Sequence, residues 1–143
     1  MRVTTFLCLG ASVFGLLQPA RAQEEGPKGF RCTFETGSSW SYAGGAFKTK
    51  APAPLTFEIT DVDLEGQSAQ LVPAEGEKPG SLKIVRAINA NHFLEVVNEG
   101  FLNLTTIYDK DPETGKYPAV HSRHFGVLGQ PVFAQYAGFC TAK

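Results

Sequence analysis

The amino-acid sequence predicts an all-β fold, a small and mostly antiparallel β-barrel of about eight strands whose first and last strands are joined by a disulfide. Apolar and polar residues alternate with a period of two along most of the chain, which is typical of strands with one buried face. The connections between these segments are short and rich in turn-forming residues, which favours an antiparallel meander. Two cysteines near the two ends can pair, and closure of the sheet removes its exposed edges.

The first 22 residues have the three zones of a cleavable secretion signal. Arg2 is a positive start, residues 3–17 are uncharged and mostly apolar, and residues 18–22 contain a proline and end on small residues. The apolar stretch is shorter than the roughly 20 residues that span a bilayer, so we expect cleavage after Ala22 and not a membrane anchor. We therefore expect an exported protein, periplasmic or extracellular, with a flexible leader at residues 23–28 and one β-barrel domain at residues 29–143.

The charge of the processed chain bounds its partners. Removing 22 of the 143 residues leaves 121, which suits one compact domain. Arg2 and Arg21 leave with the signal, so 13 basic residues become 11 against 14 acidic ones, a net charge of −3. Proteins that bind nucleic acids or anionic membrane surfaces usually carry a row of basic residues, and the sequence contains none. We therefore expect neither as a partner.

Cys32 and Cys140 are the two cysteines of the processed chain. An even count in an exported protein favours a disulfide, and two buried free thiols are the alternative. A bridge requires Cα atoms within about 7 Å of each other. The pairing therefore predicts that the first and last strands are neighbours.

Four strand segments are expected in the first half of the domain. In residues 30–34 aromatic and cysteine side chains alternate with polar ones, and in residues 40–47 a Gly-Gly pair predicts a bulge or a tight turn. Two prolines precede residues 55–60, where Leu, Phe and Ile alternate with Thr and Glu in the clearest strand pattern of the chain. A turn containing a glycine then leads into residues 68–72.

Five further segments complete the expected barrel. A loop at residues 73–80 precedes them, Asn-rich and Gly-containing turns separate the early ones, and a polar loop at residues 109–116 precedes the last two. They are residues 82–87, 92–97, 101–108, 117–125 and 132–140. No stretch of ten residues has the period of an amphipathic helix.

The densest group of reactive side chains is His121-Ser122-Arg123-His124. On a strand, His121 and Arg123 point to one face and Ser122 and His124 to the other, so the two histidines do not share a metal. Ser122 and His124 lie about 7 Å apart on one face, like a nucleophile and base without an orienting carboxylate. We expect no catalytic residue. The candidates, if there is one, are Ser122, His124 and His121, and the structural alternative is a half-exposed strand with Arg123 paired to an acid.

The loop Asp109–Gly115 has acidic residues at alternate positions, as a calcium loop does. Its glycine comes one place late, and Val120 occupies the position of the usual bidentate glutamate. A solvated hairpin loop is therefore the expectation, and we expect no metal and no cofactor.

Aromatic residues outnumber what the centre of a small barrel needs. Most are expected in the core, and others suit recognition at a rim or an exposed patch. The candidate binding residues are Trp40, Tyr42, Arg123 and Tyr136.

Three segments resemble a family of small exported bacterial proteins that has no established activity. They are Phe30-Arg31-Cys32-Thr33-Phe34, residues 119–124 (AVHSRH) and residues 135–140 (QYAGFC). The resemblance covers nearly the whole processed chain and implies a bacterial periplasm. Phe30-Arg31-Cys32 with Cys140 also resembles the start and the bridge of periplasmic lysozyme inhibitors, although their Ser-Gly-x-x-Tyr loop has no counterpart. Gly37-Ser38-Ser39-Trp40 is similar to the Gly-x-Trp signature of lipocalins, with one residue more.

Together these features predict a non-enzymatic binding module of the cell envelope. Its partner is expected to be a small apolar ligand or another envelope protein. The alternatives are a periplasmic enzyme inhibitor built like the lysozyme inhibitors, a hydrolase using Ser122 with His124 or His121, and a purely structural envelope protein.

Overall fold

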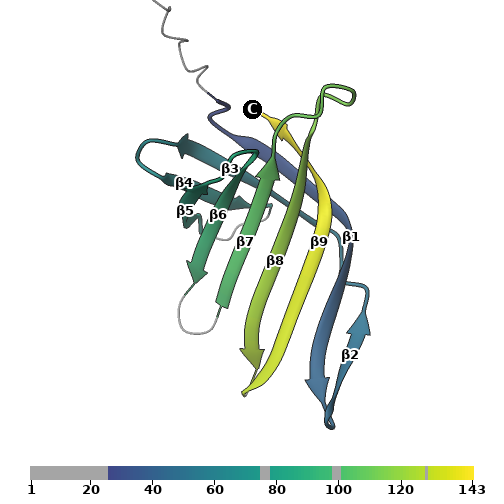
Figure 1. Ribbon diagram of the computed structural model, residues 1–143. Helices are drawn as coiled ribbons and strands as arrows, with labels where there is room; N and C mark the ends of the chain where they lie inside the picture. The colour runs from purple at the N-terminus through teal and green to yellow at the C-terminus, as the bar shows by residue number, and fades with distance from the viewer. Residues whose placement is uncertain (1–25, 75–77, 98–100, 128) are drawn as a thin grey trace, which may run out of the picture.

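The computed structural model describes residues 26–74, 78–97, 101–127 and 129–143, and these form nine antiparallel strands without a helix (Figure 1). The expected signal and the turn at residues 98–100 lie outside the described residues. The strands are β1 (Phe30–Ala43), β2 (Ala46–Lys50), β3 (Leu55–Asp63), β4 (Ser68–Pro73), β5 (Gly80–Arg86), β6 (Ala90–Val97), β7 (Phe101–Tyr108), β8 (Tyr117–Val127) and β9 (Gln130–Ala142).

Eight of these strands close into a ring, which confirms the predicted all-β barrel. Each strand from β3 to β8 pairs with the next one along the chain, and β1 pairs with both β3 and β9. β2 stands outside this ring and pairs with the second half of β1. Of the expected leader, residues 26–28 are described, and the carbonyl of Lys28 accepts a hydrogen bond from the Val62 N–H at 3.0 Å.

The disulfide between Cys32 and Cys140 joins the first and last strands, as predicted. The two residues lie directly opposite each other in the β1–β9 ladder, with their Cα atoms 4.0 Å apart. Both are fully buried. The bridge therefore locks the seam at which the barrel closes.

The core of the barrel consists of apolar side chains from nearly every strand. Phe34, Phe93, Ile59 and Ile84 are among its largest fully buried members. Ring contacts run through it, including Phe34 against Phe57 with centroids 5.6 Å apart. The side chains that line the ring therefore pack against each other, which is how small barrels are normally filled.

A β-bulge in β1 reverses which residues face inward. Before it Phe34 lies opposite Gly138, and after it Thr36 lies opposite Ala137, so Glu35 is the extra residue. Because side chains alternate along a strand, one extra residue exchanges the two faces of everything that follows. Even-numbered residues of β1 therefore point inward before the bulge and outward after it.

Segments 30–34 and 40–47 were expected as separate strands, and this expectation is wrong for β1. β1 continues through residues 36–39 because ladder hydrogen bonds with β9 need backbone groups and not apolar side chains. The expected tight turn at Gly44-Gly45 is confirmed. Both glycines have positive φ, 63° and 81°, the conformation of a two-residue hairpin turn.

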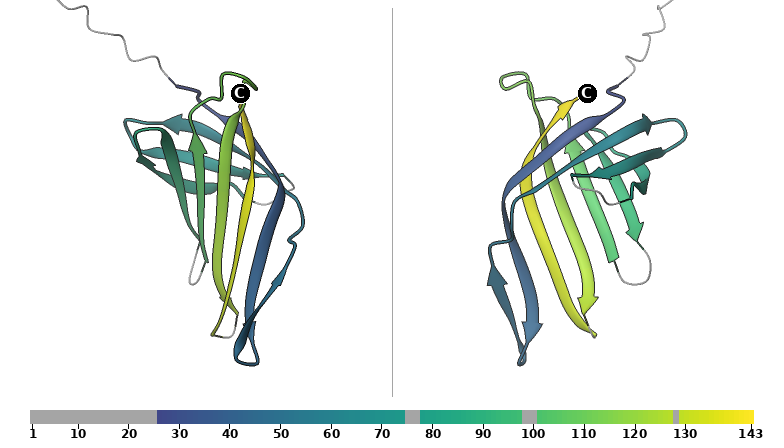
Figure 2. Two further views of the ribbon diagram at one scale, coloured as in Figure 1. Left: turned by 45° about the vertical axis from the view of Figure 1, so that its right-hand side comes forward. Right: turned by 180° about the vertical axis from the view of Figure 1, so that it is seen from behind.

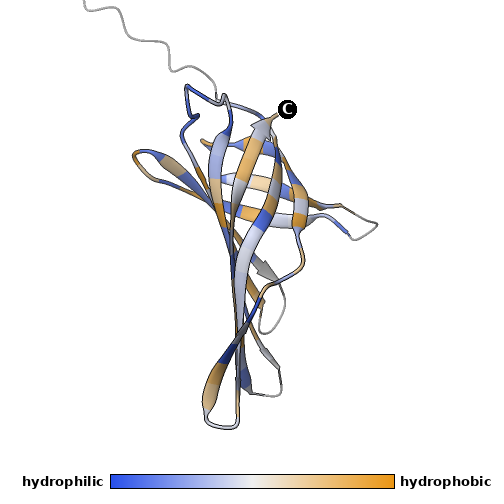
Figure 3. Cartoon of the chain, turned by 90° about the vertical axis from the view of Figure 1, so that its right-hand side faces the viewer, coloured by the Kyte–Doolittle hydropathy of each residue, from blue (hydrophilic) through white to orange (hydrophobic). Residues whose placement is uncertain are grey.

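Beyond the bulge the sheet extends past the ring of strands. β3 pairs with β1 only as far as Phe34, and from Ser39 onward β2 takes its place. The second half of β1, β2, the end of β8 and the beginnings of β7 and β9 form this extension, which projects from the lower side of the barrel (Figure 2). Figure 3 shows it nearly edge-on, with hydrophobic segments towards its far end.

Candidate functional site

The outer face of this extension carries a row of side chains across five strands, and those on β7, β8, β9 and β1 are apolar or aromatic. Neighbours in the row lie directly opposite each other in consecutive ladders, from β7 through β8, β9 and β1 to β2. The row consists of Leu102, His124, Phe133, Trp40 and Thr49. Tyr42 and Phe47, which pair across β1 and β2, adjoin it. We call Leu102, His124, Phe133, Trp40, Tyr42 and Phe47 the aromatic face.

The rings of the aromatic face pack against one another. Trp40 stacks on Phe133 with centroids 4.8 Å apart and planes 13° apart, and His124 lies parallel to Phe133 on its other side at 6.3 Å. Phe47 meets Phe133 edge-on at 5.9 Å and Tyr42 at 5.1 Å. Such cross-strand pairs stabilise a sheet, yet Phe47 remains 54% exposed and Tyr42 38% exposed. The face is thus ordered and still accessible.

Two local features of the sequence put these rings on one surface. The bulge at Glu35 turns Trp40 and Tyr42 outward, where an unbroken alternation from Phe34 would have turned them inward. The Gly44-Gly45 turn then returns the chain so that Phe47 lies opposite Tyr42. Neither ring contributes to the barrel core.

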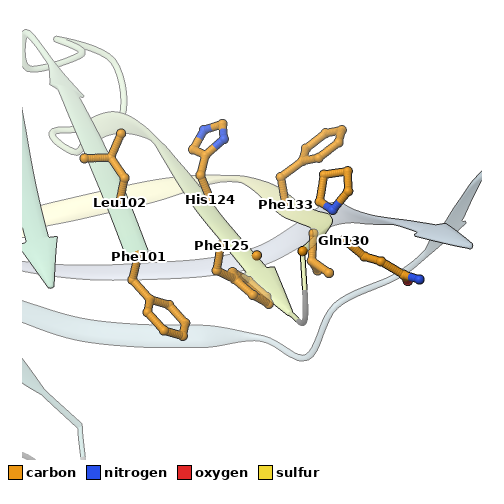
Figure 4. Close-up of a pocket in the computed structure, with 10 residues that line it drawn as sticks. Phe101, Leu102, His124, Phe125, Gln130 and Phe133 are labelled. Carbon is orange, nitrogen blue, oxygen red and sulfur yellow. The ribbon is translucent and has the colours of Figure 1, made fainter. Parts of the chain in front are cut away.

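The inner side of the same extension is apolar on β7, β8 and β9, and its row continues to Ser41 on β1 and Lys48 on β2. Phe101 stacks on Phe125 with centroids 5.6 Å apart and planes 18° apart, and Val132 follows in the next strand. Phe101 is 46% exposed. An open hollow of about 570 Å³ lies where β7 begins beside the ends of β8 and β9, and residues of both sides line it. Figure 4 shows Phe101 and Phe125 pointing away from the side that holds Leu102, His124 and Phe133.

His121 faces the barrel interior and is buried. Its Nδ1 lies 2.9 Å from the Thr105 hydroxyl, and its ring packs against Phe57 at 5.1 Å and Tyr136 at 5.9 Å. Burial, and secondarily the positive charge of Arg123, lower the pKa of His121 to about 4. The imidazole is therefore neutral near pH 7.

A short polar row crosses the interior below His121. The Asn103 amide donates a hydrogen bond to the buried Glu95 carboxylate at 2.7 Å, and Arg123 lies opposite Asn103 on β8. Arg123 is half-buried and forms no hydrogen bond or ion pair with any described residue. The expected pairing of Arg123 with an acid is therefore wrong, because the nearest acidic position in this row is two strands away and engages Asn103.

The alternation expected for residues 121–124 is seen in β8. His121 and Arg123 point inward, whereas Ser122 and His124 lie on the outer side, opposite Gln135 and Phe133. His124 stacks on Phe133, and within the described chain no hydrogen bond links it to Ser122. Ser122 and His124 therefore share the outer side of β8 without a hydrogen bond between them.

The loop after β7 is held by its own hydrogen bonds. The Asp111 carboxylate accepts bonds from the Thr114 hydroxyl at 2.7 Å and the Glu113 N–H at 3.0 Å. These bonds, the Thr114 one foremost, lower the pKa of Asp111. No group of three or more metal-binding side chains occurs in the parts of the chain that the structure describes.

The structure separates the four candidate binding residues. Trp40 and Tyr42 lie on the aromatic face, Arg123 lies inside, and Tyr136 is a core residue packed against Phe34. The sequence interpretation missed Phe47, Phe133, Leu102 and His124 as members of that face. Only the strand register, which local patterns do not specify, could have grouped them.

The fold and the site define a class: a small disulfide-closed antiparallel barrel with an aromatic sheet extension. Family models, curated proteins and solved structures were compared with the chain, and none of them matches it. Within the described residues, no helix has the length and apolar character that a bilayer crossing requires.

Proposed function

We propose that this protein is an exported, non-enzymatic binding module that engages its partner through the aromatic face. The observation that carries the proposal is the row of stacked rings on a solvent-facing surface that the core does not need. Trp, Tyr and Phe are enriched where proteins bind partners, because they bury large areas with few rotatable bonds.

The packed interior of the barrel favours a binding site on the surface over a ligand cavity inside. Phe34, Phe93, Ile59 and Ile84 are fully buried there and occupy the space that a carrier of the lipocalin type leaves open. The Cys32–Cys140 bridge supports an oxidising compartment, since such disulfides persist outside the cytosol.

The test is whether a molecule from the host copurifies with the protein. Native mass spectrometry of wild type is compared with a Trp40→Ser/Phe47→Ser variant, which removes two rings of the aromatic face. The matched control is Ile88→Ser. Ile88 is 98% exposed and lies between β5 and β6, whereas the aromatic face lies towards the other end of β6, where Val97 pairs with Phe101.

We expect wild type and the Ile88→Ser control to retain the same copurifying molecule and the double variant to lose it. Circular dichroism should report an unchanged fold in all three, since neither ring belongs to the core. Equal retention by the double variant would contradict the proposal.

A further inference from the structure

We infer that the partner of the aromatic face is the interfacial region of a phospholipid bilayer, into which the far end of the sheet extension inserts; this deepens the proposed function and rests on it. The inference starts from the two sides of the extension. Phe47 lies on the outer side and Phe101 on the inner side, 54% and 46% exposed. Figure 4 shows apolar side chains leaving the same strands in opposite directions.

Two exposed apolar sides restrict what can cover them. A protein docking on a sheet buries one face and leaves the other in water. Surroundings that enclose the end of the sheet, as lipid headgroups and the adjoining acyl chains do, cover Phe47 and Phe101 together. Trp and Tyr are enriched at this depth of a membrane, because their rings combine an apolar body with a polar group. Trp40 and Tyr42 belong to the aromatic face and adjoin Phe47.

The charge pattern of the chain agrees with insertion. Residues 37–47, 101–107 and 125–139 contain no charged side chain, although the chain has 27 Asp, Glu, Lys and Arg residues. The nearest charges on β2 are Lys48 and Lys50, which follow the Gly44-Gly45 turn by about 10 and 16 Å at the rise of a strand. Amphipathic surfaces insert about 5–10 Å, so both ammonium groups lie at the level of the headgroups. Trp40 lies opposite Thr49, between the two lysines, and the ladder row of Phe101 ends at Lys48, so these two rings lie at the same level and the Gly44-Gly45 turn lies deeper.

The backbone sets the depth limit. In the described chain β2 pairs only with β1, so its other edge has backbone groups without a ladder partner. Unpaired N–H and C=O groups are not tolerated in the hydrocarbon centre, whereas water and headgroups satisfy them near the surface. The end of the extension therefore lies in the interface and does not cross the bilayer.

The experiment uses the one tryptophan of the sequence, Trp40, as its reporter. Disulfide-bonded protein from its own host is mixed with phosphatidylcholine vesicles, with and without bromine on the acyl chains. We expect a blue shift of Trp40 emission, quenching by the brominated lipid, and sedimentation with the vesicles. No anionic lipid is needed, because the segments 37–47, 101–107 and 125–139 contain no basic side chain to bind one.

Three variants that keep Trp40 discriminate between occupants. Phe47→Ser on the outer side and Phe101→Ser on the inner side should each weaken partitioning roughly tenfold or more, from the apolar area that each exposes. Ile88→Ser should partition like wild type. Circular dichroism checks that each variant keeps the fold.

Absence of an emission shift with vesicles, or partitioning unaffected by Phe101→Ser, would overturn the membrane inference. If vesicles are not bound but a host protein is retained through Trp40 and Phe47, the inference fails and the proposed function stands. If neither lipid nor any host molecule depends on those two rings, both fail.

Discussion

Removal of the Cys32–Cys140 bridge tests the closure of the barrel most directly. The perturbation is the double substitution Cys32→Ala/Cys140→Ala, compared with wild type reduced by a thiol reagent. The two cysteines are 108 residues apart, and in the chain-entropy account a cross-link of that span stabilises the folded state by about 5 kcal/mol. That is comparable with the whole stability of a small domain, about 5–15 kcal/mol.

The assay is urea unfolding followed by circular dichroism. With a slope of about 1.5 kcal/mol per molar urea, the midpoint should fall by about 3 M in the double variant. Reduced wild type should fall equally, because it keeps both buried sulfurs and loses only the constraint on the unfolded chain. A decrease of the midpoint by less than about 1 M, or a decrease in the double variant alone, would contradict the chain-entropy account. The effect of the substitutions would then come from local packing.

Two further predictions concern the β1–β9 seam and the buried histidine. Gly138→Ala should destabilise by roughly 2–3 kcal/mol in urea unfolding, because its Cβ would clash with the Thr33 carbonyl oxygen. Gly126→Ala should change stability by less than about 0.5 kcal/mol, because its Cβ would meet only the Gln130 carbonyl oxygen, at an ordinary contact distance of 3.9 Å. Equal effects would contradict the close approach of the strands. The pKa of His121 is lowered from 6.5 to about 4 in the folded chain. Between these pH values the unfolded chain binds a proton at His121 and the folded chain does not, so the free energy of unfolding should fall by roughly 3 kcal/mol from pH 6.5 to pH 4. Unfolding of His121→Leu at pH 7 and pH 4.5 should lack this part of the loss, and an unchanged pH dependence would show that His121 is not its source.

Much of the barrel followed from local patterns. The alternation in residues 55–60 predicted β3, whose Phe57 and Ile59 are buried as the pattern requires. The paired cysteines predicted that β1 and β9 are neighbours, because a disulfide has a fixed reach. These features depend on residues adjacent in sequence or on a covalent bond.

The candidate site was predicted only in part. Trp40 and Tyr42 were named from their residue type, and both lie on the aromatic face. Tyr136, named on the same ground, is a core residue beside His121. Residue type does not distinguish the two outcomes, since aromatic rings suit a core and a recognition surface equally.

Local patterns predicted the strand periodicity, a bulge or a tight turn at Gly44-Gly45, and the pairing of the chain ends. The position at which the face of β1 reverses depends on a long-range contact with β9. The bulge at Glu35 lies where β9 presents Gly138, a residue without a Cβ that lets the backbones approach closely. Because that contact joins residues about a hundred positions apart, no local pattern encodes it, and with it comes the outward turn of Trp40 and Tyr42.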